Sequence, residues 1–153
     1  MLKPLLIIGV GGSGGKTIRS MIQALERKLE SVRYEGGLPE KWQFLQIDTT
    51  YDGVQFPAKM LDKSNFHSVV PSGLDFYGMV NNLTRGQLLS EQQAMLSSWG
   101  IANSSISLSK GAGQIRAIGR MAGAAASSST LNAIKNSIAK MKGGSIAELQ
   151  AIR

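Results

Sequence analysis

The spacing of apolar residues in the first third of the chain predicts a strand, a helix and a second strand. Residues 4–10 are apolar throughout, which is typical of a strand buried on both faces. From 16 to 32, apolar residues recur every three or four positions and predict an amphipathic helix. Its apolar positions are Ile18, Ile22, Leu25 and Leu29, and the charged residues placed largely on its other faces are Arg19, Glu26, Arg27 and Lys28. A second strand at 42–48 completes a right-handed parallel crossover unit.

The rest of the chain has a weaker pattern up to a long helical segment near its end. Prolines and glycines divide residues 49–110 into short pieces, for which we predict a strand at 66–70, helices at 73–82 and 90–99, and a loop or edge strand at 103–109. From 114 to 142, apolar residues return to helical spacing. The run 127–130 is rich in serine and leaves open one long helix or two helices with a kink. Gly143 and Gly144 end this segment, and residues 145–153 predict a short helix or the start of a strand.

Charge and composition narrow the choice of partner. The chain has 153 residues, enough for one domain with a sizeable core, and no cysteine. Its 17 Lys and Arg outnumber its 10 Asp and Glu, and the net charge of +7 suits an anionic ligand. The basic residues are dispersed, however, and form no recognised nucleic-acid signature, so we expect no nucleic-acid partner. The apolar run 5–10 is too short for a membrane span or a signal segment, so we expect a cytoplasmic protein with no membrane partner.

The segment 9–17, GVGGSGGKT, carries the main chemical signal because it joins the first predicted strand to the first predicted helix. Glycines allow backbone N–H groups to approach a phosphate without an intervening side chain, and the start of a helix adds the positive end of its dipole. The sequence therefore predicts an anion site, with the helix beginning at about Lys16. Two short motifs give different interpretations of this segment.

A P-loop is the first interpretation. The motif requires a glycine five positions before the Gly-Lys-Thr triplet formed by Gly15, Lys16 and Thr17. Val10 stands at that place, and the neighbouring glycines, Gly9 and Gly11, lie one residue too early or too late. The loop therefore has the wrong length to wrap a phosphate in the usual way.

A dinucleotide-binding fold is the second interpretation. Gly9, Gly11 and Gly14 match the G-x-G-x-x-G pattern between a strand and a helix, and Asp48 ends the second strand, where a ribose-binding acid is expected. Asp48 lies farther from Gly14 than the usual spacing of about 20 residues. An NAD- or FAD-binding Rossmann domain of an oxidoreductase remains an alternative.

Three glycine- or threonine-containing segments, taken in order, resemble the nucleotide loops of the tubulin/FtsZ superfamily, in particular the bacterial tubulin-like proteins. In that family the first loop carries Gly-Gly-x-Gly-Gly, the second commonly reads Asn-Thr-Asp, and the third carries Gly-Ala-Gly followed by a Gly-Arg or Gly-Lys pair on a helix. The corresponding residues here are Gly11, Gly12, Ser13, Gly14 and Gly15, then Asp48, Thr49 and Thr50, then Gly111, Ala112 and Gly113 with Gly119 and Arg120.

The resemblance implies an α/β fold, namely a Rossmann-like three-layer parallel sheet of the tubulin/FtsZ nucleotide-binding type. It also implies that the protein binds GTP or GDP, with Mg²⁺ accompanying GTP. The first-loop amides, the Ser13 hydroxyl and Lys16 would bind the phosphates, and the third loop would sense the terminal phosphate. Asp48 would contact the ribose or a metal-linked water. Lys16 departs from the family, which usually has Asn there, and Asp48 and Thr50 stand where Asn and Asp are expected. The resemblance assigns no catalytic residue and no metal ligand to this chain.

The resemblance also implies an incomplete domain. Residues 53–108 are longer than the family's usual connection, which predicts an insertion, and the family's fourth glycine-rich loop has no counterpart after Gly144. We therefore expect residues 1–153 to form the N-terminal portion of a filament-forming GTPase, with an incomplete sheet and no GTP hydrolysis by itself. Such a sheet exposes apolar surface, which favours association with another copy or with a missing C-terminal portion. A second alternative is a non-catalytic assembly module of the same fold.

Overall fold

The computed structural model divides the chain into two compact units. It describes residues 2–51, 61–70, 78–79, 108, 111–112 and 115–152. The first, called the sheet unit, comprises the described residues within 1–48, 52–67 and 131–153. The second unit comprises those within 49–51 and 68–130. Each unit is described by itself.

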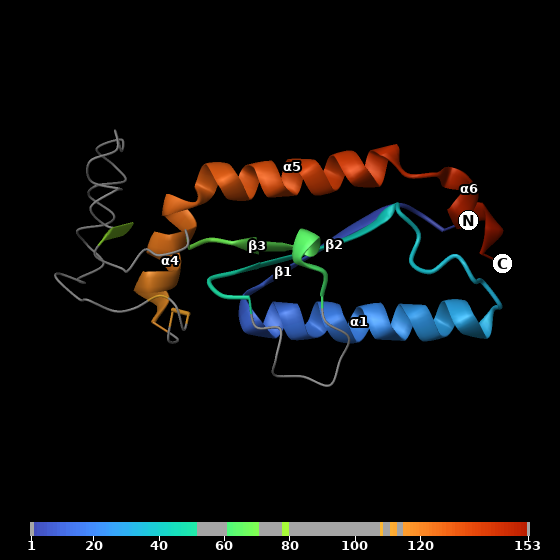
Figure 1. Ribbon diagram of the computed structural model, residues 1–153, viewed down its shortest axis with the longest axis horizontal. Coiled ribbons are helices and arrows are strands. Elements are labelled where there is room, and N and C mark those ends of the chain that lie inside the picture. Colours follow the sequence, from blue (N-terminus) through green and yellow to red (C-terminus); the bar gives the residue numbers. More distant parts are fainter. Residues whose placement is uncertain are drawn as a thin grey trace. The chain divides into compact units, whose positions relative to one another are not determined.

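The sheet unit is an α/β arrangement in which helices lie on both faces of a small sheet (Figure 1). Its elements, in chain order, are β1 (Leu5–Val10), α1 (Gly11–Ser31), β2 (Trp42–Asp48), the short 3₁₀ helix η1 (Lys63–Asn65), β3 (Phe66–Ser68), α5 (Ser127–Gly143, from Leu131 onward) and α6 (Ile146–Ala151). The strand order is β1-β2-β3. The strands β1 and β2 are parallel, with Leu5 opposite Trp42 and Val10 opposite Ile47. The predicted strand–helix–strand crossover is therefore present.

The core of the sheet unit lies between α1 and the sheet. Trp42 and Phe44 on β2 are buried against Ile18 and Ile22 of α1, and Leu149 of α6 joins the same cluster. Since strand side chains alternate, these β2 residues point to one face, whereas Leu45 points to the face covered by α5. Each fully buried side chain of this kind stabilises the fold by about 1.5–3 kcal/mol. The predicted apolar face of α1 is thus confirmed.

A polar clamp holds the end of α5 and the start of α6 against the beginning of β2. Lys41 is 5% exposed, and its Nζ donates hydrogen bonds to the carbonyl oxygens of Met141 at 3.3 Å and Lys142 at 3.1 Å. The backbone N–H of Glu40 donates to the Glu148 carboxylate at 2.8 Å. A buried ammonium at the carbonyl end of a helix is favourable because those carbonyls carry the negative end of the helix dipole.

Several element boundaries differ from the prediction. The helix α1 begins at Gly11 rather than at about Lys16, so the glycines form its first turn. The C-terminal segment consists of two helices that break at Ala126, and the segment after Gly144 is the short helix α6 rather than a strand. The strand β3 ends at Ser68, two residues early. The predicted helices at 73–82 and 90–99, the stretch 103–109 and the insertion at 53–108 lie largely outside the described residues, and the insertion stays a prediction.

The described part of the second unit is built around α4 (Arg116–Ala125). Ile118, Met121 and Ala122 of this helix are buried, as are Met79 and Leu108. Of the helices in the described ranges, none has both the length and the apolar character that crossing a bilayer requires.

Candidate functional site

At the junction of β1 and α1, a long helix begins without a side-chain cap from its N-cap residue. Val10 occupies the N-cap position with extended backbone angles, and its side chain offers no oxygen to the first amides. The first turn contains no acidic residue. The first four N–H groups of an α-helix have no partner within the helix, and Ser, Thr, Asp or Asn normally accepts from one of them. The amides and the positive dipole end of α1 are therefore suited to an external anion.

Two glycines let this helix start directly on the strand end. A Cβ on Gly9 would lie 2.5 Å from the carbonyl oxygen of Gly14 and 2.7 Å from Cδ1 of Ile18. Gly11 has a φ of +70°, in the left-handed region that favours glycine. Around Gly11 and Gly12, a Cβ would meet no atom of the described residues within 4 Å. Gly9 and Gly14 thus allow the strand end and the helix to pack closely, while Gly11 and Gly12 leave space beside the first amides.

A buried arginine, Arg19, lies about two turns into α1, where the sequence pattern did not place it. Gln46 of β2 lies so close to Gly15 that a Cβ there would overlap the Gln46 side-chain amide. The Gln46 Oε1 accepts a hydrogen bond from Arg19 Nη1 at 3.3 Å, and the two side chains are 2% and 7% exposed. The prediction that Arg19 lies away from the packed face is wrong. The sequence feature that could have indicated its burial is its position four residues after Gly15, which places both residues on the helix face that contacts β2.

The remaining first-segment residues lie at the surface. Ser13 and Lys16 are exposed. The carbonyl oxygen of Ser13 accepts a hydrogen bond from Thr17 Oγ1 at 3.0 Å, which secures the backbone of the first turn. The Ser13 hydroxyl and the Lys16 ammonium are therefore on the accessible side of the chain, as a role in anion binding requires.

Asp48 stands at the same sheet edge as the glycine segment. Val10 and Ile47 are opposite each other in the β1–β2 register, so the chain continues from this pair into Gly11 on one strand and Asp48 on the other. Asp48 is half-buried. Ligands of parallel α/β sheets bind at the carboxyl ends of the strands, which is where these residues lie.

In the second unit, the predicted second and third loops meet. Gly111 has a φ of +91°, and a Cβ on it would lie 3.2 Å from Thr49 Oγ1 and 3.4 Å from Thr50 Oγ1. The Gly111 amide donates to the Leu108 carbonyl at 3.0 Å. Ser68 Oγ donates to the Thr49 carbonyl at 3.1 Å, which fixes the backbone just after β2. Two segments about sixty residues apart in the printed sequence thus bring two hydroxyls and a glycine together.

The other predicted residues of the third loop are placed as follows. Ala112 is half-buried, and its carbonyl accepts from the Ile115 amide at 3.0 Å at the start of α4. Gly119 and Arg120 lie on α4, with Arg120 exposed. Gly113 lies outside the described residues. The first loop belongs to the sheet unit and the third to the second unit, so their convergence on one polyphosphate stays a prediction.

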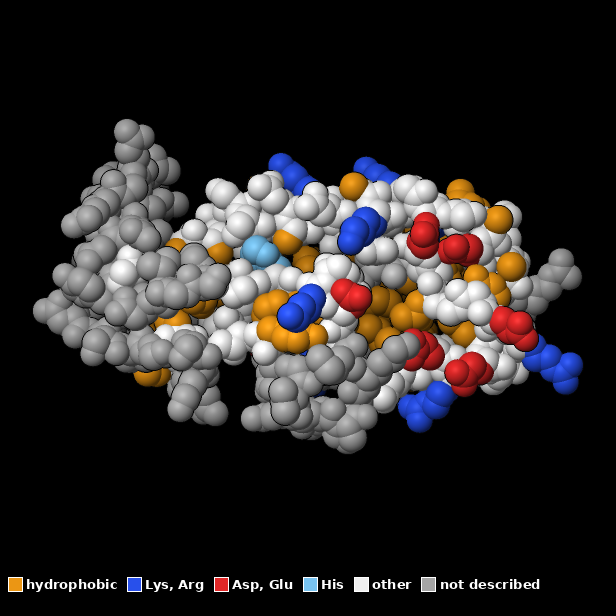
Figure 2. Space-filling model, viewed as in Figure 1, with side chains coloured by type: hydrophobic (Ala, Val, Ile, Leu, Met, Phe, Trp, Pro, Cys, Tyr) orange, Lys and Arg blue, Asp and Glu red, His pale blue; other side chains and the backbone are white. Residues whose placement is uncertain are grey.

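Neither a cluster of like charges, on the face that Figure 2 shows, nor a metal site is found in the described part of the chain. Blue and red side chains are interspersed on the face shown in Figure 2. In the described ranges there is no group of three or more His, Cys, Asp or Glu that could hold a metal ion. The candidate chemistry is therefore that of backbone amides, hydroxyls and single charges.

Comparison with known proteins gives one match. The sequence model of a protein family described as tubulin like matches residues 6–152. No curated protein and no solved structure matches the chain.

Proposed function

The chain belongs to the tubulin-like protein family, and on that premise we propose that it binds GTP or GDP. The family implies a guanine nucleotide, and the sheet edge after β1 supplies a fitting phosphate site. The amides of Gly11, Gly12, Ser13 and Gly14 bind the phosphates in this proposal, with help from Lys16, and Gly15 lets the first turns of α1 pack against Gln46.

One observation supports this proposal most strongly, the uncapped start of α1. Val10 provides no capping oxygen, and a side chain at Gly12 would meet none of the described atoms within 4 Å. A helix 21 residues long therefore begins with amides that have no partner within the helix and no cap from Val10, and its dipole has its positive end there. A phosphate supplies the acceptor oxygens and the negative charge that such an end favours.

The family also gives the second and third loops a role in nucleotide binding in this proposal. Asp48, at the end of β2 in the sheet unit, and the hydroxyls of Thr49 and Thr50 would contact the nucleotide near the ribose. The third loop, at Gly111, Ala112 and Gly113, would sense the terminal phosphate, and contact between Gly111 and the two threonines supports coupling of these loops. Mg²⁺ accompanying GTP would be held mainly by phosphate oxygens and water, which is common for this ion.

Thermal unfolding with different nucleotides tests the proposal. At a concentration one hundred times the dissociation constant, a ligand that binds only the folded state adds about 2.7 kcal/mol. For a chain of this size that amounts to a rise in Tm of about 5–10 °C. We expect GTP and GDP to raise the Tm, and ATP, NAD and FAD to do so less or not at all.

Two matched glycine variants test whether the rise in Tm comes from nucleotide bound at the start of α1. Gly12→Val introduces a branched side chain beside the first-turn amides, whereas Gly123→Val introduces the same group on α4, where a Cβ also meets none of the described atoms. We expect Gly12→Val to lose the shift caused by GTP and Gly123→Val to keep it. A shift with NAD or FAD alone would favour the oxidoreductase alternative, and no shift with any nucleotide would favour the assembly module.

We further propose that the chain self-associates through a filament-type contact, as the family suggests. Exposed apolar residues on β1 support this idea, since Ile8 is 39% and Val10 is 71% exposed. Sedimentation velocity with GTP and with GDP tests it. A larger sedimentation coefficient with GTP is expected, and a monomer at all concentrations with both nucleotides would contradict it.

A further inference from the structure

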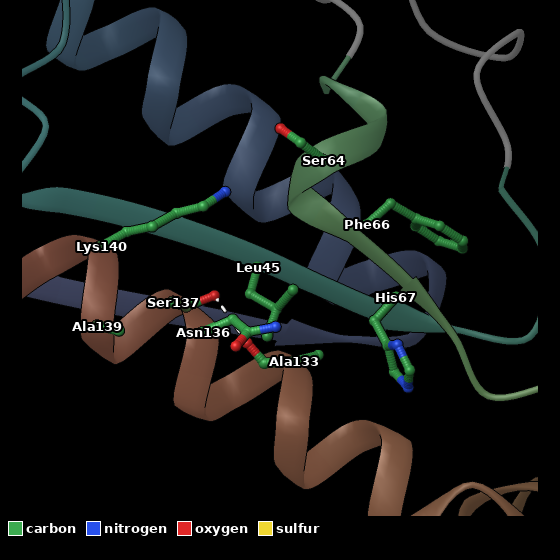
Figure 3. Close-up of a pocket in the computed structure, with 9 residues that line it drawn as sticks. All are labelled: Leu45, Ser64, Phe66, His67, Ala133, Asn136, Ser137, Ala139 and Lys140. Atoms are coloured by element: carbon green, nitrogen blue, oxygen red, sulfur yellow. Dashed lines mark hydrogen bonds between the residues drawn. The ribbon is translucent and has the colours of Figure 1, made fainter.

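A cavity separates α5 from the sheet on the face opposite the α1 core. Its volume is about 430 Å³, and all of its lining residues belong to the sheet unit. Leu45 of β2 lies at its centre in Figure 3, with Ser64 of η1 on one side and Asn136 of α5 on the other. Lys140 and His67 lie toward opposite ends of the cavity in this view. The cavity is distinct from the glycine segment, whose residues do not line it.

The cavity lies beside a stripe of small and polar residues on α5. Ala133, Asn136, Ser137 and Lys140 stand at positions i, i+3, i+4 and i+7 and line the cavity. Ser137 is buried and Ala133 half-buried, whereas Asn136 and Lys140 are exposed. A helix that covers a sheet normally presents its apolar stripe there. On α5, by contrast, Leu131 is 50% exposed. The arrangement therefore leaves a space with hydrogen-bonding groups where most helices would fill the gap.

The lining combines one cation with neutral polar groups and an apolar floor. Lys140 provides an ammonium, Asn136 an amide and Ser64 a hydroxyl, while Leu45 and Phe66 provide apolar surface. The cavity thus offers polar and apolar surface in about equal amounts, so a ligand with one polar end and one apolar end fits its lining.

Two titratable groups near the cavity refine its charge. Burial lowers the pKa of His67 below its ordinary value of 6.5, so this imidazole is neutral at neutral pH. The Asp62 carboxylate accepts a hydrogen bond from the backbone N–H of Ser64 at 2.7 Å, which, together with the nearby charge of Lys140, lowers its pKa. Lys140 is the one charged residue among the described residues that line the cavity, and Asp62 lies outside the lining. A single ammonium can form a charge-assisted hydrogen bond with one carboxylate.

We propose that this cavity binds a small monocarboxylate with a flat apolar body. The carboxylate accepts hydrogen bonds from Lys140 and Asn136, and the body packs on Leu45 and Phe66. This binding is independent of the proposed nucleotide site.

Titration of the ¹⁵N-labelled chain by two-dimensional NMR tests the proposal, with benzoate as the probe and benzylamine as a probe of the same shape and opposite charge. We expect saturable shifts at Leu45, His67 and Asn136 with benzoate, at an affinity on the order of millimolar for so small a ligand. Benzylamine should cause none of these shifts. Absent or unsaturable shifts with benzoate would overturn the proposal, and so would equal shifts with both probes.

Two further variants separate binding from folding. Lys140→Met keeps the aliphatic stem and removes the charge, and we expect it to weaken benzoate binding about tenfold, as loss of a charged hydrogen bond does. Lys135→Met, on the same helix and outside the lining, should bind like the parent. Ala133→Leu adds three carbon atoms to the lining and narrows the cavity, so it should weaken binding without lowering the Tm. Equal affinities of the two lysine variants, or unchanged binding in Ala133→Leu, would refute the assignment.

Discussion

The contact between Gly9 and Gly14 allows a quantitative test of how the β1–α1 junction is built. In Gly9→Ala, the new methyl group would lie 2.5 Å from the Gly14 carbonyl oxygen, whereas ordinary contacts begin at 3.4 Å. The first turn of α1 must therefore move by about 1 Å away from the strand. Ile18 Cδ1 can shift by side-chain rotation, but the two other nearest atoms belong to the Gly14 backbone and can move only with the helix turn.

The expected loss of stability follows from two opposing effects. Inserting a methyl group into a closely packed site costs about 1–3 kcal/mol. Replacing glycine by alanine restricts the unfolded chain, which returns about 0.4–1 kcal/mol. We therefore expect Gly9→Ala to lose about 1–2 kcal/mol of unfolding free energy, and its Tm to fall by about 2–8 °C.

The matched control is Gly12→Ala in the same segment. A Cβ at Gly12 meets no described atom within 4 Å, and its φ is not in the left-handed region, so this variant should be neutral or gain up to about 1 kcal/mol. Urea unfolding without nucleotide, followed by far-UV circular dichroism, measures both variants. Equal stabilities of Gly9→Ala and Gly12→Ala would refute the idea that close backbone packing at Gly9 positions the helix start.

Three further predictions concern other polar contacts. Burial lowers the pKa of His67 from its ordinary value of 6.5, so the unfolded chain takes up the proton first as the pH falls. Stability should therefore decline as the pH falls through this value, and His67→Phe should lessen the decline; identical pH profiles in urea unfolding would contradict this. Lys41→Met removes both hydrogen bonds to the end of α5 and should cost about 1–2 kcal/mol in the same assay, whereas the exposed Lys28→Met should cost little; equal losses would show that the clamp is unimportant. Ser145 caps α6 by accepting from the Ala147 amide at 3.1 Å, so Ser145→Ala should cost about 1 kcal/mol, and an unchanged unfolding midpoint would argue against the cap.

The sequence alone was sufficient for elements whose pattern is local. The second strand, predicted at about 42–48, is β2 at Trp42–Asp48, and the helical spacing of Ile18, Ile22 and Leu29 identified the buried face of α1. The order of the three loop segments was enough to suggest the family that the sequence comparison then matched over residues 6–152.

The tertiary structure decided features that depend on contacts between distant segments. Glycine is a poor helix former, so the local pattern placed the start of α1 after the glycines, yet the absence of a Cβ at Gly9 and Gly14 lets the first turn begin against the strand. The burial of Arg19 depends on Gln46, and the meeting of Thr49 with Gly111 depends on a fold that brings separated segments together. The spacing of apolar residues indicates which side chains are buried, because each side chain's tendency to avoid water depends on its own chemistry. Which partner a buried polar group meets is set by chain topology, and a single sequence carries no local sign of it.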